Sequence, residues 1–137
     1  MIIIIDLEIG NTGSISNMLK LHGVACKISN KYEDIEKATK MILPGVGTFD
    51  RGMEKLTQFN LVELINHKVL KEKIPILGIC LGMQLLFQGS EEFGGAEGLG
   101  LLEGLFETFH ENGELRTRGK HKRGFLTVLG KLLIRMG

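Results

Sequence analysis

The amino-acid sequence predicts an α/β fold, in which a doubly wound, mostly parallel sheet carries helices on both faces. Short, apolar, β-branched runs such as Ile2–Ile5 and Met41–Leu43 are typical of parallel strands that are buried on both sides. They alternate with stretches in which apolar residues recur at helical spacing, and this alternation favours right-handed crossovers between parallel strands. The 137 residues are enough for one domain with its own core.

The expected elements follow one another in strand–helix order. After the first strand, the turn Gly10–Ser14 holds an N-cap candidate, and Gly23 ends the helix that follows it. Further along the chain we expect a strand, a short amphipathic helix, the third strand, one long helix and a fourth strand, at Val24–Ile28, Tyr32–Lys40, Met41–Leu43, Gly52–Leu70 and Ile76–Ile79. A Gly- and Glu-rich stretch comes next, followed by strands expected at Leu99–Leu102 and Leu105–Phe109.

Cys80 stands between Gly78 and Gly82, where the fourth strand passes into an apolar helix. Gly-x-Cys-x-Gly is the thiol counterpart of a nucleophile elbow, because the glycines let the backbone turn where a Cβ would clash. The turn is expected to set the thiol at a helix N-terminus, whose partial positive charge favours a thiolate. It also leaves the N–H of Leu81 free to bind an oxyanion. The alternative is an inert core cysteine, which is common on apolar strands.

Two polar features are expected beside this turn. The segment Gly45-Val46-Gly47 follows the third strand, and parallel strands bring their carboxyl ends to one edge of the sheet. A peptide N–H there would supply a second oxyanion donor, the alternative being a plain loop exit. Gln84 lies one helical turn after Cys80 and faces the same way, which suits recognition of a small polar substrate or, alternatively, a solvated helix position.

The composition is typical of a soluble globular protein, with 43% hydrophobic and 24% charged residues. Cys26 and Cys80 show neither disulfide nor metal spacing, and the four histidines are unpaired, so no metal site is expected. The N-terminus lacks the features of a signal peptide, and no apolar stretch reaches bilayer length. We therefore expect a cytoplasmic protein with no membrane partner.

The charge changes sign near the C-terminal end. Residues 1–115 carry 10 Lys and Arg against 16 Asp and Glu, a sum of −6, whereas residues 116–137 carry 7 basic side chains and no acidic one. The basic stretch 116–123 has no interleaved aromatic residues, so we expect no nucleic-acid partner. The sequence predicts a domain at 1–115 and a basic tail at 116–137 that does not pack as part of it, although Leu132–Ile134 would allow a helix.

Taken together, these features resemble the class I glutamine amidotransferases and, within them, the glutaminase subunits of imidazole glycerol phosphate synthase. The segments that carry the resemblance are Gly10-Asn11, Leu43–Phe49, Leu77–Phe87, Ser90–Glu92 and Glu97–Leu102. The similarity runs in order from Met1 to about Phe109, and we find none from Arg116 onward.

The resemblance implies a flavodoxin-like class I glutamine amidotransferase domain with a thiol glutaminase site. Cys80 would attack the side-chain amide of L-glutamine to form a thioester, and the N–H groups of Val46 and Leu81 would stabilise the oxyanion. The positions that match those holding glutamine are Gly47, Gln84 and Glu92. Ammonia would pass to a (βα)₈-barrel cyclase or synthase subunit. This subunit and the glutaminase subunit would form a heterodimer that acts in histidine biosynthesis. No metal or organic cofactor is implied.

The sequence departs from the family in two places. Leu7-Glu8 stands where the family usually has Tyr-Gly, so Glu8 is expected to strain the backbone. Family members also continue past position 137, where a Phe-His-Pro-Glu motif supplies the catalytic His and Glu. This chain contains no such motif, so we expect a C-terminally incomplete, inactive domain. Read in another frame, the codons of Gly124–Leu129 permit the family segment Ile-Pro-His-x-x-Trp, and we hypothesise an out-of-frame tail.

Three alternatives stay open at this point. The chain would supply ammonia to another pathway, such as amidation of a surface sugar, with the same residues around Cys80. It would act as a non-catalytic docking protein that keeps the scaffold and has lost the catalytic His and Glu. As a third alternative, the basic tail would bind nucleic acid with an affinity that falls steeply with salt.

Overall fold

The computed structural model describes residues 1–90, 96–107, 116–118, 125–128 and 131–134. The helices are α1 (Thr12–Leu21), α2 (Tyr32–Glu36), α3 (Phe49–Gln58), α4 (Val62–Leu70) and α5 (Leu81–Leu85). The strands up to the candidate nucleophile are β1 (Ile2–Ile5), β2 (Cys26–Ser29), β3 (Lys40–Gly45) and β4 (Ile76–Cys80). The later strands are β5 (Phe87–Ser90), β6 (Ala96–Glu97), β7 (Leu102–Glu107), β8 (Arg116–Arg118), β9 (Phe125–Val128) and β10 (Lys131–Ile134).

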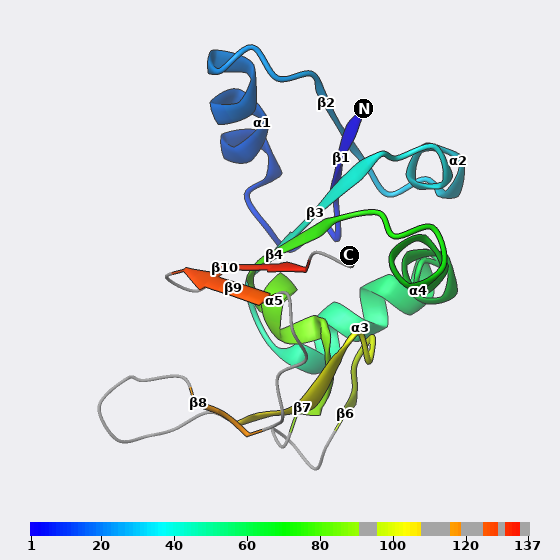
Figure 1. Cartoon of the computed structure of the whole chain (residues 1–137), viewed down its shortest axis with the longest axis vertical. Helices are drawn as coiled ribbons and strands as arrows, with labels where there is room; N and C mark the ends of the chain where they lie inside the picture. Colours follow the sequence, from blue (N-terminus) through cyan, green and yellow to red (C-terminus); the bar gives the residue numbers. More distant parts are fainter. Residues whose placement is uncertain (91–95, 108–115, 119–124, 129–130, 135–137) are drawn as a thin grey trace.

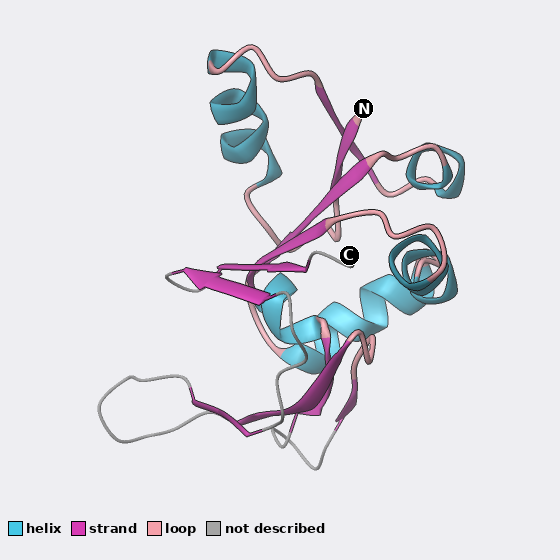
Figure 2. Ribbon diagram, in the orientation of Figure 1, coloured by secondary structure: helices cyan, strands magenta, loops and turns pink. Residues whose placement is uncertain are grey.

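The main sheet has six strands in the order β2-β1-β3-β4-β10-β9. Strands β1 to β4 are parallel, whereas β10 runs antiparallel to both β4 and β9. Figures 1 and 2 show α1 on one side of the parallel strands and α2 and α4 on the other. The predicted α/β fold with a mostly parallel sheet and helices on both faces is therefore confirmed. A second sheet, in the order β6-β5-β7-β8, follows α5.

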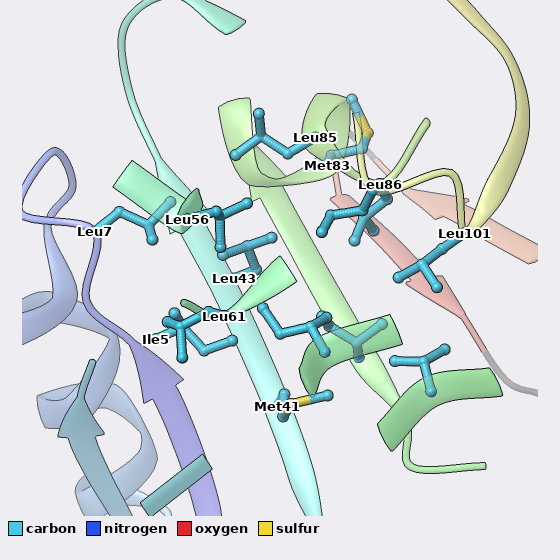
Figure 3. Packing of buried hydrophobic residues seen from close by; sticks show 14 of the residues in the cluster. Ile5, Leu7, Met41, Leu43, Leu56, Leu61, Met83, Leu85, Leu86 and Leu101 are labelled. Atoms are coloured by element: carbon cyan, nitrogen blue, oxygen red, sulfur yellow. The ribbon is translucent and has the colours of Figure 1, made fainter. Parts of the chain in front are cut away.

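The core forms around β1 and β3, whose apolar residues are buried on both faces of the sheet. Ile3, Ile4 and Ile5 are all buried, and every residue of β3 after Lys40 is buried as well. Figure 3 shows Leu43 of β3 among Leu56 and Leu61. Burying one such side chain contributes about 1.5–3 kcal/mol to the free energy of folding. The buried central strands therefore hold the loops at their carboxyl ends in place.

The long helix expected at 52–70 is in fact two helices, α3 and α4, and that prediction was wrong. Asn60 has a φ of 56° and breaks the helix, and the Leu61 N–H donates to the carbonyl oxygen of Leu56 as the chain turns. Asn tolerates the left-handed conformation better than most residues do. The turn lets both Leu56 and Leu61 face the same core.

Several strand boundaries also differ from the expected ones. Strand β3 continues through Pro44 to Gly45, in register with Ile79 and Cys80 of β4, although proline was expected to stop it at Leu43. In place of the two strands expected at 99–102 and 105–109 there is one strand, β7, which begins at Leu102, so residues 99–101 are not in a strand. Its described part ends at Glu107, so positions 108–109 lie outside the described residues.

Two of the three described strands of the basic tail, β9 and β10, join the main sheet, whereas β8 pairs with β7 in the second sheet. β10 pairs with β4, with Leu132 opposite Gly78 and Leu133 opposite Leu77, so the stretch for which we had allowed a helix is a strand. An open β4 edge would present unpaired N–H and C=O groups, and an apolar strand satisfies them. The domain boundary at residues 115 and 116 stays a prediction.

No helix in the described part of the chain has the length and apolar character needed to cross a bilayer.

Candidate active site

Cys80 is the last residue of β4 and the residue that precedes α5. Its backbone has φ 53° and ψ −120°, a conformation that is strained for a residue with a side chain, and its side chain is exposed. The sharp strand-to-helix turn predicted from Gly-x-Cys-x-Gly is therefore present. It lifts the thiol out of the sheet at the carboxyl end of a central strand, as a nucleophile elbow does. The alternative of an inert core cysteine does not fit this exposure.

The glycines on either side of Cys80 are required by close backbone packing. A Cβ on Gly78 would come within 2.6 Å of the Cα of Met83, so α5 can fold back onto β4 only if residue 78 is glycine. A Cβ on Gly82 would overlap the carbonyl oxygen of Leu43 on β3. The clash that the sequence predicted at the elbow is thus a clash with helix α5 in one case and with strand β3 in the other.

The two predicted oxyanion donors lie at the same edge of the sheet but differ in the hydrogen bonding of their N–H groups. Leu81 is the first residue of α5, and N–H groups in the first turn of a helix have no intrahelical acceptor. The Val46 N–H, by contrast, donates a 2.7 Å hydrogen bond to the carbonyl oxygen of Ile9. Val46 can serve as an oxyanion donor only after this bond to Ile9 breaks.

The residue after Val46 gives the backbone the freedom for such a change. Gly47 has a φ of +113°, a region that side chains rarely allow, and no atom lies close to the place of a Cβ. Thr48 then caps α3, because its hydroxyl accepts the N–H of Arg51 at 3.4 Å. The segment that carries the expected donor thus sits between a buried strand and a capped helix.

The remaining predicted site residues are placed only in part. Gln84 is half-buried on α5, one turn after Cys80, and shares that short helix with Leu81. Glu92 lies outside the described residues. Because Gly45 pairs in register with Cys80, the sheet brings Val46 and Gly47 to the edge that carries the thiol. The roles of all these residues stay predictions.

No histidine in the described ranges forms a hydrogen bond with Cys80. His22 follows α1, and His67 on α4 lies 3.5 Å from Glu72 at an exposed position. The other two, His110 and His121, fall outside the described residues. Within the part that the structure describes there is also no cluster of three or more His, Cys, Asp or Glu that could hold a metal ion.

The sequence predicted the backbone strain at Glu8 but not the ion pair that its side chain forms. Glu8, which stands at a position where the resemblance expected Gly, has a φ of 61°, so the expected backbone strain is confirmed. Its N–H donates to Asp6 Oδ1 at 2.9 Å, and its carboxylate lies 2.8 Å from Lys55 Nζ on α3. Glu8 at a position where the family usually has glycine indicated the strain. No pattern in the sequence indicated that Lys55, 47 residues away, would be its partner.

Comparison with a protein-family model identifies the family of the chain. The model described as "Glutamine amidotransferase class-I" matches residues 3–127. This match continues past Arg116, the residue from which the sequence pattern predicts no family similarity.

Curated relatives agree with the family model. The chain is 54% identical over 102 residues to "Imidazole glycerol phosphate synthase subunit HisH 2" of Methanococcus maripaludis, covering 74% of this chain and 50% of the relative. It is 47% identical over 103 residues to the subunit HisH 2 of Pseudomonas aeruginosa, covering 75% of this chain and 50% of the relative. The chain thus spans about half the length of these relatives.

A solved structure shows the same fold. The protein described as "Crystal structure of glutamine amidotransferase" superposes with a TM-score of 0.70 at 21% identity, over 81% of this chain and 59% of the other. The family match across most of the sequence, the relatives and the shared fold lead to one conclusion: the chain belongs to the class-I glutamine amidotransferases.

Proposed function

We propose that this chain supplies the nucleophile of a glutaminase site of the kind found in imidazole glycerol phosphate synthase. The observation that carries the proposal is the exposed Cys80 in a strained turn between β4 and α5. Its support is the similarity to relatives that are named as subunits of that synthase.

In the proposed reaction the Cys80 thiolate attacks the side-chain amide carbon of L-glutamine. The carbonyl oxygen becomes an oxyanion that accepts hydrogen bonds from the N–H of Leu81 and, once released from Ile9, from that of Val46. The C–N bond then breaks, ammonia leaves, and water hydrolyses the glutamyl thioester to glutamate. Gly47, Gln84 and Glu92 would hold the substrate.

The base that activates the thiol and protonates the leaving ammonia is not among the described residues. In cysteine nucleophile sites this base is usually a histidine that a third group orients. The chain has no Phe-His-Pro-Glu string, so we propose that the 137 residues alone do not turn over glutamine efficiently.

The ammonia would be used by a partner. Because the relatives are named as subunits of a synthase, we propose a (βα)₈-barrel cyclase subunit as the partner, a heterodimer as the assembly, histidine biosynthesis as the pathway and the cytoplasm as the location. Supply of ammonia for amidation of a surface sugar would use the same residues around Cys80, and co-purification of the barrel subunit separates the two.

A second candidate is a docking protein without activity. An activated substrate separates it from a glutaminase. With the γ-(4-nitrophenyl) ester of L-glutamate, the Cys80 thiolate attacks the ester carbonyl and 4-nitrophenolate leaves without protonation, so no general acid is needed. We expect one burst of 4-nitrophenolate per chain and a thioester on Cys80 by mass spectrometry.

The controls for this experiment are Cys80→Ser, which should abolish the burst, and Cys26→Ser, which should leave it unchanged. The D-isomer of the ester should acylate Cys80 much more slowly. Equal rates for the two isomers, or a burst that survives Cys80→Ser, would contradict the proposed function.

A further inference from the structure

The loop between β1 and α1 is held by two contacts made by adjacent residues. The carbonyl oxygen of Ile9 accepts the N–H of Val46 at 2.7 Å. The carboxylate of Glu8 forms an ion pair of 2.8 Å with Lys55 Nζ. The loop also lies directly against β3, since a Cβ on Gly10 would be 3.3 Å from the Cα of Gly45.

The lysine of this ion pair is itself well fixed. Lys55 lies on α3, its side chain is only 12% exposed, and its Nζ sits 5.6 Å from the ring centroid of Phe59. Glu8 is 54% exposed and takes a left-handed backbone conformation that only a few residue types favour. Lys55 is therefore the more buried partner of the pair, and it anchors the exposed Glu8.

The hydrogen bond between Val46 and Ile9 and the ion pair between Glu8 and Lys55 are connected through the chain, because Glu8 and Ile9 are adjacent. The segment Val46–Thr48 lies between β3 and α3. The ion pair joins α3 to the β1–α1 loop, whose Ile9 carbonyl accepts the Val46 N–H. Any movement of Ile9 away from Val46 also moves Glu8, the residue before it. Breaking the Val46 hydrogen bond is therefore coupled to stretching the ion pair.

We propose that the ion pair Glu8–Lys55 is a clamp that keeps the Val46 N–H bonded to Ile9, and that both residues are positioning residues for the oxyanion donor. The clamp sets how often the Val46 N–H is released and can turn toward a substrate on Cys80. The catalytic meaning of the clamp rests on the proposed glutaminase function, whereas its effect on the Val46 amide does not.

The expected size of the effect follows from the exposure of the pair. Partly exposed ion pairs shift an equilibrium by up to about fivefold. Removing the clamp should therefore raise the population in which the Val46 N–H is free by about two- to fivefold. High salt should act in the same direction, because screening weakens an exposed pair.

The direct test is hydrogen exchange of the Val46 amide by NMR on the ¹⁵N-labelled chain. The variants are Glu8→Gln, which keeps the shape of the side chain, Lys55→Met, which keeps the stem on Phe59, and the double variant. We expect Val46 to exchange about two- to fivefold faster in each single variant, with no further gain in the double one. The amides of Ile4 and Leu43 serve as internal references for global opening.

The matched control is Glu54→Gln. It removes the exposed Arg51–Glu54 pair of 3.8 Å on the same helix without touching the loop. Exchange at Val46 should not change in this variant. Raising NaCl from about 0.05 to about 0.5 M should speed exchange at Val46 in the wild type and not in the double variant.

Unchanged exchange at Val46 in both single variants would overturn the clamp, and so would additive effects in the double variant. A uniform increase that includes Ile4 and Leu43 would also overturn it, because it would show global destabilisation instead.

The functional consequence is measured with two reagents. Acylation of Cys80 by the glutamyl 4-nitrophenyl ester passes through an oxyanion, whereas alkylation by iodoacetamide forms an S–C bond and expels iodide without one. The clamp predicts that Glu8→Gln raises the ratio of the acylation rate to the alkylation rate. If Val46 exchange responds as expected but no variant is acylated, the proposed function fails and the clamp stands.

Discussion

Gly82 of α5 lies directly against the carbonyl oxygen of Leu43 on β3, with no room for a Cβ between them. This contact sets how closely the helix that follows Cys80 approaches the central strand. Since Gly45 of the same strand pairs with Cys80, the contact also fixes the distance between the thiol and the segment that carries Val46. The glycine after the nucleophile is therefore a packing requirement as well as a turn requirement.

The first prediction is that Gly82→Ala strongly destabilises the chain. The added methyl group overlaps backbone that cannot move without shifting β3, so we expect a loss of about 3 kcal/mol or more, at the upper end of overpacking effects. Urea unfolding measures it. The control is Gly13→Ala in α1, where the nearest atom lies 4.0 Å away, and which should gain up to about 1 kcal/mol. Equal stabilities of the two variants would contradict the packing described here.

The second prediction concerns the two thiols. Cys80 is exposed, whereas Cys26 is half-buried with its Sγ 3.5 Å from Ser16 Oγ. Iodoacetamide should therefore modify Cys80 faster than Cys26 in the native chain, because the exposed thiol is the accessible one. Peptide mapping by mass spectrometry after limited labelling distinguishes them, and in urea the two rates should converge. Faster labelling of Cys26 without urea would show that the strand-to-helix turn is wrongly placed.

The third prediction is that glutamine turnover by the 137-residue chain is very slow. Loss of a catalytic base from a nucleophile site costs roughly 10⁴–10⁶ in rate. A coupled glutamate dehydrogenase assay, with a full-length relative and its barrel partner as the reference, measures the difference. Turnover within about tenfold of the relative would mean that another residue acts as the base, and His110 would be the first to substitute.

The fourth prediction is a pH effect at the edge of the sheet. The hydrogen bond from Lys27, and then that from Ser29, hold the pKa of Asp34 below its usual value. A carboxyl whose folded pKa is lowered stabilises the protein above its unfolded pKa of about 3.9, and this contribution is lost as the pH falls through the folded pKa.

Carboxyl-carbon NMR titration checks this prediction. Lys27→Gln should move the Asp34 midpoint upward, toward the value of a free aspartate, and should lower the stability of the chain near neutral pH more than in acid. The matched control is Lys31→Gln, which removes only a weaker, longer-range charge effect. A larger upward shift in the control than in Lys27→Gln would show that the hydrogen bond is not the main cause.

The fifth prediction concerns the basic tail. The change of charge after residue 115 leads us to expect that amides at 131–134 exchange much faster than those at 76–79, even though β10 pairs with β4 in the structure. Hydrogen exchange followed by mass spectrometry separates the two stretches. Equal protection would show that β10 is an evolved part of the sheet and would remove the out-of-frame hypothesis.

Local patterns identified the elements whose sequence leaves few options. Ile2–Ile5 is a strand with three buried residues, because successive β-branched apolar residues favour a strand that is covered on both faces. Cys80 was placed in a strand-to-helix turn because Gly78 and Gly82 allow backbone approaches that other residues forbid. These are statements about residues close together in the chain, and they were confirmed.

Other features depended on contacts that no local pattern contains. The local pattern does not show the helix break at Asn60, because the apolar spacing continues across it. The shared core of Leu56 and Leu61 favours the turn. The strand at 131–134 forms because β4 offers a free edge, whereas the same apolar residues would also fit a helix.

The sequence by itself therefore determined the α/β fold, the exposed cysteine elbow and the family to which the chain belongs. Only the tertiary structure decided the state of the site: the Val46 N–H is bonded to Ile9, and Glu8 is paired with Lys55. The physical reason is the range of the interactions. Steric limits at glycines act between neighbours in the chain, whereas a hydrogen bond or an ion pair between distant residues exists only once the sheet has brought them together.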